Sequence, residues 1–227
     1  MYKFCFFFLL YFIYCVIGYI LECIYCSILN KKIVSNRGFL IGPYLSIYGT
    51  GAICILFLLK KYVNDPITLF IMASLVATIL EYFTSFIMEK IFKARWWDYS
   101  EQKFNINGRV CLKNSVLFGI GSFFVVYIVN PFIFRLLHSF NKTLIIVLGI
   151  IFLIVYILDI IISVFTIYKI RENSISINKD LTEEISEQVK KRFLKNKYFY
   201  NRLLSAYPRV KNIKTYNRLK ELIDKNK

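Results

Sequence analysis

Five segments of this chain carry almost no charge and approach or exceed the length that crosses a lipid bilayer. They lie at about residues 4–29, 43–59, 66–89, 115–137 and 143–168. An α-helix rises about 1.5 Å per residue, so about 20 apolar residues cross a hydrocarbon core of about 30 Å. Inside a bilayer, the backbone polar groups of such segments are satisfied by helix formation. The sequence therefore predicts an all-α protein, a polytopic membrane helical bundle of about five spans.

The second segment is the least regular of the five. It opens with Gly42-Pro43-Tyr44 and contains Gly49 and Gly51, so a re-entrant or broken helix is the alternative to a full span. The fourth segment contains Pro131, which predicts a kink because proline removes one backbone hydrogen bond.

The chain divides by composition into two parts. Residues 1–168 form the predicted transmembrane domain, and residues 169–227 form a basic tail. The net charge is +16, from 30 Lys and Arg against 14 Asp and Glu, and more than half of the basic residues lie in the tail. Apolar residues from Leu181 to Phe193 recur every four positions, which predicts an amphipathic cytoplasmic helix lying on anionic lipid. Interleaved glutamates and the membrane tether argue against nucleic acid as a partner.

Basic residues also predict the orientation. They are concentrated in the loops at 30–42 and 90–114 and in the tail, and they are sparser in the two loops of the other side. Cytoplasmic loops carry the excess of Lys and Arg in membrane proteins. We therefore expect a multi-pass protein of the cell membrane with its N-terminus outside and its C-terminus in the cytoplasm.

Three acidic residues lie inside the apolar segments: Glu22, Glu81 and Asp159. An acid at the centre of a membrane helix costs about 2.5–3.5 kcal/mol on insertion scales, so such residues face a bundle interior or an aqueous path. With the predicted orientation, all three lie about 10–15 Å inside the cytoplasmic boundary.

A polar stripe runs through the third segment. Its members recur at spacings of three and four residues, which places them on one helix face: Ser74, Thr78, Glu81, Ser85 and Glu89. Hydroxyl groups alone would indicate contact between helices. With an acid among them, the stripe predicts a functional interior, in which these residues line a transport path together with Glu22 and Asp159.

Two loops on the predicted cytoplasmic side carry the candidate ligand-binding residues. These are Asn36, Arg37, Arg95, Trp97, Asp98, Asn105, Asn107 and Arg109. A guanidinium binds a phosphate or pairs with a buried carboxylate, and both interpretations stay open here. Trp96-Trp97 is also typical of an interfacial anchor. The Asn107-Gly108 turn should direct Arg109 back to the membrane, where we expect it to pair with Glu81 or Glu89.

Metal, cofactor and nucleotide sites are not predicted. Six cysteines include one C-x-x-C pair, Cys23 and Cys26, but there is no second pair and His138 is the only histidine. We expect no metal, no cofactor and no disulfide framework. The chain lacks a phosphate-binding loop motif, so a transporter of the ATP-driven type would need a separate ATPase subunit.

The segment from about residue 10 to residue 135 resembles a known family. The residues that carry the resemblance include Gly18, Glu22, Asn36 to Leu40, Gly42-Pro43, Ile47 to Gly49, Glu81-Tyr82, Thr84-Ser85, Glu89, Trp97 to Tyr99, Asn105 to Arg109 and Phe118-Gly119. On these residues the chain resembles the ABC-transporter type IV permeases, the CmpB-like bacterial integral membrane proteins. It departs at Tyr19, where the family prefers Trp, and at Ser46, where a second Pro is expected. The resemblance implies a permease and supplies no substrate or catalytic residue.

The function predicted from these observations is that of a membrane transport component with acids in its interior. One alternative is a membrane enzyme acting on a lipid-linked or phosphate-bearing substrate, with Glu81 or Asp98 as base. Another is a non-catalytic accessory membrane protein. The expected partners are the lipid bilayer, an ATPase subunit and further copies of the chain.

Overall fold

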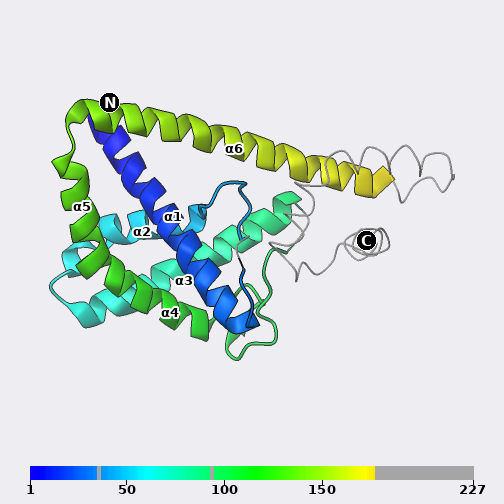
Figure 1. Cartoon of the computed structure of the whole chain (residues 1–227). Helices are drawn as coiled ribbons and strands as arrows, with labels where there is room; N and C mark the ends of the chain where they lie inside the picture. Colours follow the sequence, from blue (N-terminus) through cyan, green and yellow to red (C-terminus); the bar gives the residue numbers. More distant parts are fainter. Residues whose placement is uncertain (35–36, 93–94, 177–227) are drawn as a thin grey trace.

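A computed structural model describes residues 1–34, 37–92 and 95–176, the last ten by their backbone alone, and confirms the predicted all-α membrane bundle (Figure 1). Asn36 and the predicted tail helix lie outside the described residues. The helices are α1 (Tyr2–Asn30), α2 (Ser46–Leu58), α3 (Pro66–Phe92), α4 (Leu112–Phe124), α5 (Asn130–Ser139) and α6 (Lys142–Ser176). Between them lie the 3₁₀ turn η1 (Lys60–Tyr62), the strands β1 (Asn105–Ile106) and β2 (Val110–Cys111), and the π turn η2 (Val125–Val129).

Four helical stretches of the described chain are long and apolar enough to cross a membrane. They are α1, α3, α6 and the continuous stretch Leu112–Ser139 that joins α4, η2 and α5. In the last of these, the π turn immediately precedes Pro131, where the sequence predicts a kink. A π turn re-routes backbone hydrogen bonds locally, which accommodates the donor that proline lacks.

The second predicted span, 43–59, is not one continuous helix. Helix α2 begins only at Ser46 and has 13 residues, so its length of about 20 Å is less than a hydrocarbon core. The chain before it is a series of bends that reaches the middle of α1, where the backbone N–H of Leu45 donates to the carbonyl of Cys15 over 2.9 Å. The segment is therefore helical only from Ser46 to Leu58, and residues 37–45, called loop one from here, are non-helical.

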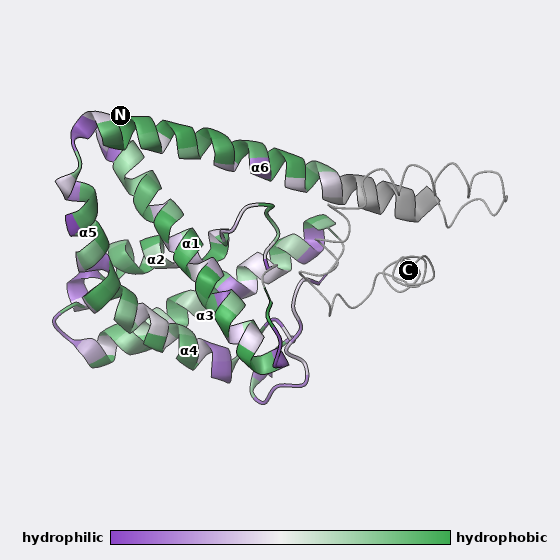
Figure 2. Ribbon diagram, in the orientation of Figure 1, coloured by the Kyte–Doolittle hydropathy of each residue, from purple (hydrophilic) through white to green (hydrophobic). Residues whose placement is uncertain are grey.

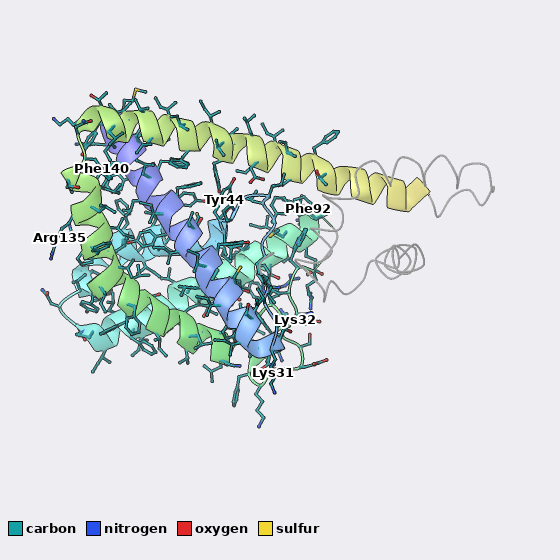
Figure 3. All side chains as sticks on the ribbon, viewed as in Figure 1. Lys31, Lys32, Tyr44, Phe92, Arg135 and Phe140 are labelled. Atoms are coloured by element: carbon teal, nitrogen blue, oxygen red, sulfur yellow. The ribbon has the colours of Figure 1, made fainter. Side chains whose placement is uncertain are left out.

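Helices α1, α3 and α6 run in one direction, and α2 and the α4–α5 stretch run in the other. Pairs of contacts show two of these directions. Gly18 lies against Tyr48 and Cys15 against Gly49, so α1 and α2 are antiparallel, whereas Cys5 lies against Gly149 and Phe12 against Phe152, so α1 and α6 run the same way. Figure 1 shows the N-terminus, the α2–α3 turn and the α5–α6 turn at one end of the molecule, with the end of α3 and the start of α4 at the other. In Figure 3 the labelled Arg135 and Lys31 mark these two opposite ends. The end that contains Lys31 is called the loop-three end, after loop three, residues 95–111, which connects α3 to α4 there.

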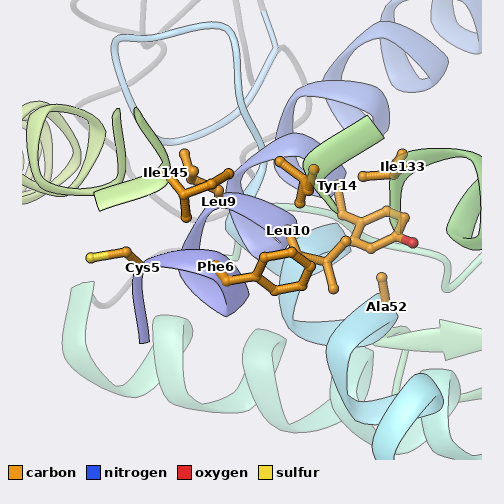
Figure 4. Packing of buried hydrophobic residues seen from close by; sticks show 9 residues of the cluster. Cys5, Phe6, Leu9, Leu10, Tyr14, Ala52, Ile133 and Ile145 are labelled. Atoms are coloured by element: carbon orange, nitrogen blue, oxygen red, sulfur yellow. The ribbon is translucent and has the colours of Figure 1, made fainter. Parts of the chain in front are cut away.

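Helix α1 is the centre of the bundle. Its apolar side chains form the main buried cluster with residues of α2, α5 and α6 (Figure 4): Cys5, Phe6, Leu9, Leu10, Tyr14, Ala52, Ile133, Leu137 and Ile145. Most other surfaces of the long helices are apolar and exposed, as the green helical ribbons of Figure 2 show. Exposed apolar helix surfaces of this kind suit a lipid environment.

Candidate functional site

The polar stripe of α3 faces α4 at one end and loop three, residues 95–111, at the other. Thr78 donates to the Ser115 hydroxyl of α4 over 2.7 Å, and a Cβ at Gly119 of α4 would meet the Ser74 hydroxyl. This part of the stripe packs two helices together, as the hydroxyl interpretation predicts. The next three members of the stripe lie beside loop three and have a different character.

Glu81 is the most deeply buried acid of the described residues, with 4% of its surface exposed. Its Oε1 accepts a hydrogen bond from the Tyr99 hydroxyl of loop three, over 3.2 Å. Its Oε2 is buried and has no hydrogen-bond partner among the described residues. The amide side chain of Asn114 lies within hydrogen-bonding reach of the carboxylate. The carboxylate thus has two polar neighbours and no cationic partner among the described residues.

Glu22 lies opposite Glu81 and is well supplied with donors. Arg37 of loop one binds its Oε1 over 2.8 Å, and the Tyr48 hydroxyl of α2 donates to its Oε2 over 2.8 Å. The Cys26 thiol adds a weaker contact to Oε1 at 3.4 Å. Glu22 therefore ties α1 to loop one and α2.

Two tyrosines connect the two carboxylates. Tyr48 donates to Glu22 and also lies near Glu81, whereas Tyr99 donates to Glu81 and also lies near Glu22. Burial raises the pKa of Tyr99, so its phenol remains a donor at physiological pH. We call Glu22, Tyr48, Glu81 and Tyr99 the interior acid cluster.

Glu89, at the end of the stripe, holds two arginines of loop three. Arg109 pairs with its Oε2 over 2.7 Å, and Arg95 donates to the same oxygen over 3.3 Å. The expected pairing of Arg109 with Glu81 or Glu89 is confirmed for Glu89. Arg109 also contacts the Ser85 hydroxyl at 3.4 Å, and its guanidinium lies over the rings of Tyr82 and Phe86.

A tight hairpin shapes loop three. Strands β1 and β2 pair antiparallel, and the turn between them has positive φ at Asn107 (52°) and Gly108 (65°). Two successive positive φ values define a type I′ turn, for which Asn-Gly is the preferred sequence. The backbone N–H of Arg109 closes this turn on the carbonyl of Ile106 over 3.0 Å. The hairpin thereby directs Arg109 to α3.

The remaining predicted residues of loop three brace this hairpin. The Trp97 indole donates to the carbonyl of Arg109 over 2.9 Å, and Asn107 donates to the Tyr82 hydroxyl over 3.0 Å. Asn105 donates to the carbonyls of Ser100 and Gln102. Asp98 lies 3.7 Å from Arg95 and accepts from the backbone and hydroxyl of Ser100.

Asp159 of α6 lies in a second polar site, at loop one. Its carboxylate accepts from the backbone N–H groups of Ile41 and Gly42, over 2.8 and 2.7 Å, and from the hydroxyls of Tyr44 and Ser163. Figure 3 shows the labelled Tyr44 between α1 and α6. Four donors satisfy this acid fully, so its geometry is that of an anchor for non-helical backbone.

Sequence reasoning missed the tyrosines of both sites. Tyr44, Tyr48 and Tyr99 donate to Asp159, Glu22 and Glu81, respectively. The signal was weak because the chain contains 17 tyrosines, and hydropathy does not distinguish a buried donor from an interfacial ring.

The described residues contain no group of three or more His, Cys, Asp or Glu side chains that could hold a metal ion. All six cysteines are free thiols.

A family model matches residues 9–164 of the chain, and its description reads "Putative ABC-transporter type IV". The match extends beyond residue 135, where the resemblance noted above ends, and includes Asp159. No curated protein and no solved structure matches the chain.

Proposed function

Because the chain belongs to the ABC-transporter type IV family, we propose that it is a membrane transport component, a permease subunit whose path includes the interior acid cluster. The family and the membrane helices give the general class of protein. The acids of the described structure support the more specific role.

One observation carries the proposal: among the described residues Glu81 is buried without a cationic partner, and its Oε2 accepts no well-formed hydrogen bond. The other membrane acids are compensated, since four donors surround Asp159 and Arg37 pairs with Glu22. A purely structural acid would be expected to have such partners, because an unsatisfied buried oxygen destabilises the fold by about 1–3 kcal/mol. An acid retained at this cost suggests a group that acts during transport.

The position of the cluster fits an opening to the cytoplasm. Glu81 lies about 17 Å along α3 from Phe92, and the hairpin of loop three covers this end of the helix. The basic residues near this end, including Lys31, Lys32 and Arg109, favour a cytoplasmic location for it. The N-terminus then lies outside, and the tail lies in the cytoplasm.

The enzyme alternative is less well supported by the arginines. A phosphate-binding site needs free guanidinium groups, but Arg37 is paired with Glu22, and Arg95 and Arg109 are both held by Glu89. These ion pairs indicate that the three guanidinium groups stabilise the fold. A separate ATPase subunit would supply the energy, and association of several copies within the membrane remains part of the proposal.

Replacement of Glu81 by glutamine tests the proposal. Glu81→Gln keeps the volume of the side chain and removes its charge. We expect it to abolish complementation of a deletion strain while the protein inserts in the membrane at the wild-type level. Glu101→Gln is the matched control, because Glu101 is an exposed acid of loop three, and it should complement fully. Full activity of Glu81→Gln would contradict the proposed role of the cluster.

A tagged full-length chain tests the partner. Purified in mild detergent, it should retain an ATPase subunit that mass spectrometry identifies. Recovery of the chain without any ATPase, from cells in which the tagged chain complements the deletion, would exclude the ATP-driven form of the proposal.

A further inference from the structure

We infer that Glu81 is a proton-binding site, and that the carboxyl holds a proton at Oε2 while loop three covers it. This inference rests on the proposed transport function and names the ligand of the same site. It states that a proton enters and leaves the interior acid cluster during the transport cycle.

The first argument is the balance of charge around Glu81. Arg37 is engaged with Glu22, and Arg109 and Arg95 are engaged with Glu89. No cationic side chain of the described residues forms an ion pair with Glu81. An ionised carboxylate without a counter-charge is strongly disfavoured at membrane depth, and a bound proton removes the charge.

The second argument is the number of ligands that the site offers. Calcium takes six to eight oxygen ligands, and magnesium takes six in near-octahedral geometry. Here the carboxyl of Glu81 is the one acid group at this point, Tyr99 donates to its Oε1, the Tyr48 hydroxyl is directed to Glu22, and Asn114 adds a single amide. A proton needs a single oxygen. The geometry therefore favours a proton over a metal cation.

The third argument is the set of groups that face the carboxyl. Helix α1 contributes Glu22 and α2 contributes Tyr48, while loop three contributes Tyr99, beside which lies Cys111. Asn114 of α4 is uncharged, and Asp159 of α6 is occupied by loop one. The one charged neighbour that acts on Glu81 is thus another carboxylate, which further disfavours a second negative charge.

The exchange itself is a simple proton transfer. The Oε2–H bond of Glu81 breaks, the electron pair stays on the carboxylate, and the proton passes to water at the loop-three end. Tyr99 stands between Glu81 and the hairpin, so movement of loop three would expose the carboxyl to that water. Re-protonation reverses the same step.

Infrared difference spectroscopy on the full chain in lipid nanodiscs tests the inference. Spectra are compared between an acidic and an alkaline buffer. We expect a carboxylic C=O band that disappears as the pH rises and shifts to lower frequency in D₂O. The band should be absent in Glu81→Gln, displaced but present in Glu81→Asp, and unchanged in Glu101→Gln.

The possible outcomes separate the inference from the proposed function. If no band depends on Glu81, the proton site is wrong, even when Glu81→Gln abolishes complementation. If sodium or potassium removes the band at constant pH, the same carboxyl exchanges its proton for a metal cation, and the argument that the site favours a proton over a metal cation is overturned. If the band depends on Glu81 but Glu81→Gln still complements, the proton site is correct and the transport role of the cluster is wrong.

Discussion

The pairing of Arg109 with Glu89 shows how a single contact closes loop three onto α3. The Arg109 side chain is 12% exposed and that of Glu89 is 34% exposed, so this ion pair is partly desolvated. We expect Arg109→Gln to destabilise the protein in detergent by about 1–3 kcal/mol, because Glu89 then lacks its closest partner. A thermal unfolding series measures the loss.

A second substitution distinguishes pairing from ligand binding at Arg109. If the ion pair sets the loss, the double variant Arg109→Gln/Glu89→Gln should recover part of the stability. If Arg109 binds a phosphate instead, the single variant should lose activity at an unchanged melting temperature, and the second change should rescue nothing.

Asp159 supports a prediction about loop one. Asp159→Asn places an amide donor where the N–H groups of Ile41 and Gly42 already donate. Each unsatisfied donor costs about 1–3 kcal/mol, so we expect loop one to detach more often. In a chain without native cysteines, Leu40→Cys reports this, since Leu40 is 4% exposed. Its labelling by a water-soluble maleimide should accelerate by roughly tenfold or more.

The control for this measurement is Asp65→Asn, which changes an exposed acid of the α2–α3 turn and should leave the labelling rate unchanged. Equal rates with Asp159→Asn and without it would show that Asp159 does not hold loop one.

At the scale of single residues, the sequence allowed the acids to be found but not their partners. Charge inside an apolar segment is visible in a sequence, and so is the helical spacing from Ser74 to Glu89. Which donor reaches which oxygen depends on chain segments up to 118 residues apart, as for Ile41 and Asp159. The three acids have a similar predicted depth, but they belong to two separate sites, with Glu22 and Glu81 in one and Asp159 in the other.

Among the elements, the contact of α3 with α4 depends on one small residue. A Cβ at Gly119 would come within 2.1 Å of the Ser74 hydroxyl and 2.7 Å of the Phe70 ring, whereas one at Gly121 would meet nothing within 4 Å. We expect Gly119→Ala to cost about 1–3 kcal/mol by overpacking. Gly121→Ala, on the same helix, should leave stability unchanged or raise it by up to about 1 kcal/mol. Equal melting temperatures of the two variants would contradict the packing of α3 on α4.

The element that the sequence predicted least well is the second predicted span, residues 43–59. Apolar composition from 43 to 59 predicted a span with a broken helix as the alternative, and the structure shows α2 beginning at Ser46. Hydropathy averages over a window, so it does not locate the residue at which helical hydrogen bonding begins. The π turn before Pro131 was also not predicted in detail. Proline indicates that the helical hydrogen bonding is interrupted, but it does not indicate which type of turn results.

For the whole molecule, the arrangement follows from length and composition, because apolar helices in a bilayer have few alternatives to an antiparallel bundle. The direction of the bundle relative to the cell comes from charge alone. The proposed role of the interior acid cluster depends on this direction, since it places the cluster near the cytoplasm.

Labelling of single cysteines from each side of the membrane measures the direction of the bundle. Lys61, Lys103 and Lys142 are each changed to cysteine in a chain without native cysteines that still complements. Positions 61 and 142 lie at one end of the bundle, and position 103 lies in loop three at the other (Figure 1). We expect an impermeant reagent to label 61 and 142 from outside the cell, and to label 103 only after the cytoplasmic face is exposed. Labelling of 61 from the same side as 103 would show that loop one and α2 do not complete a crossing, and labelling of 103 from outside would place the acid cluster at the wrong face of the membrane.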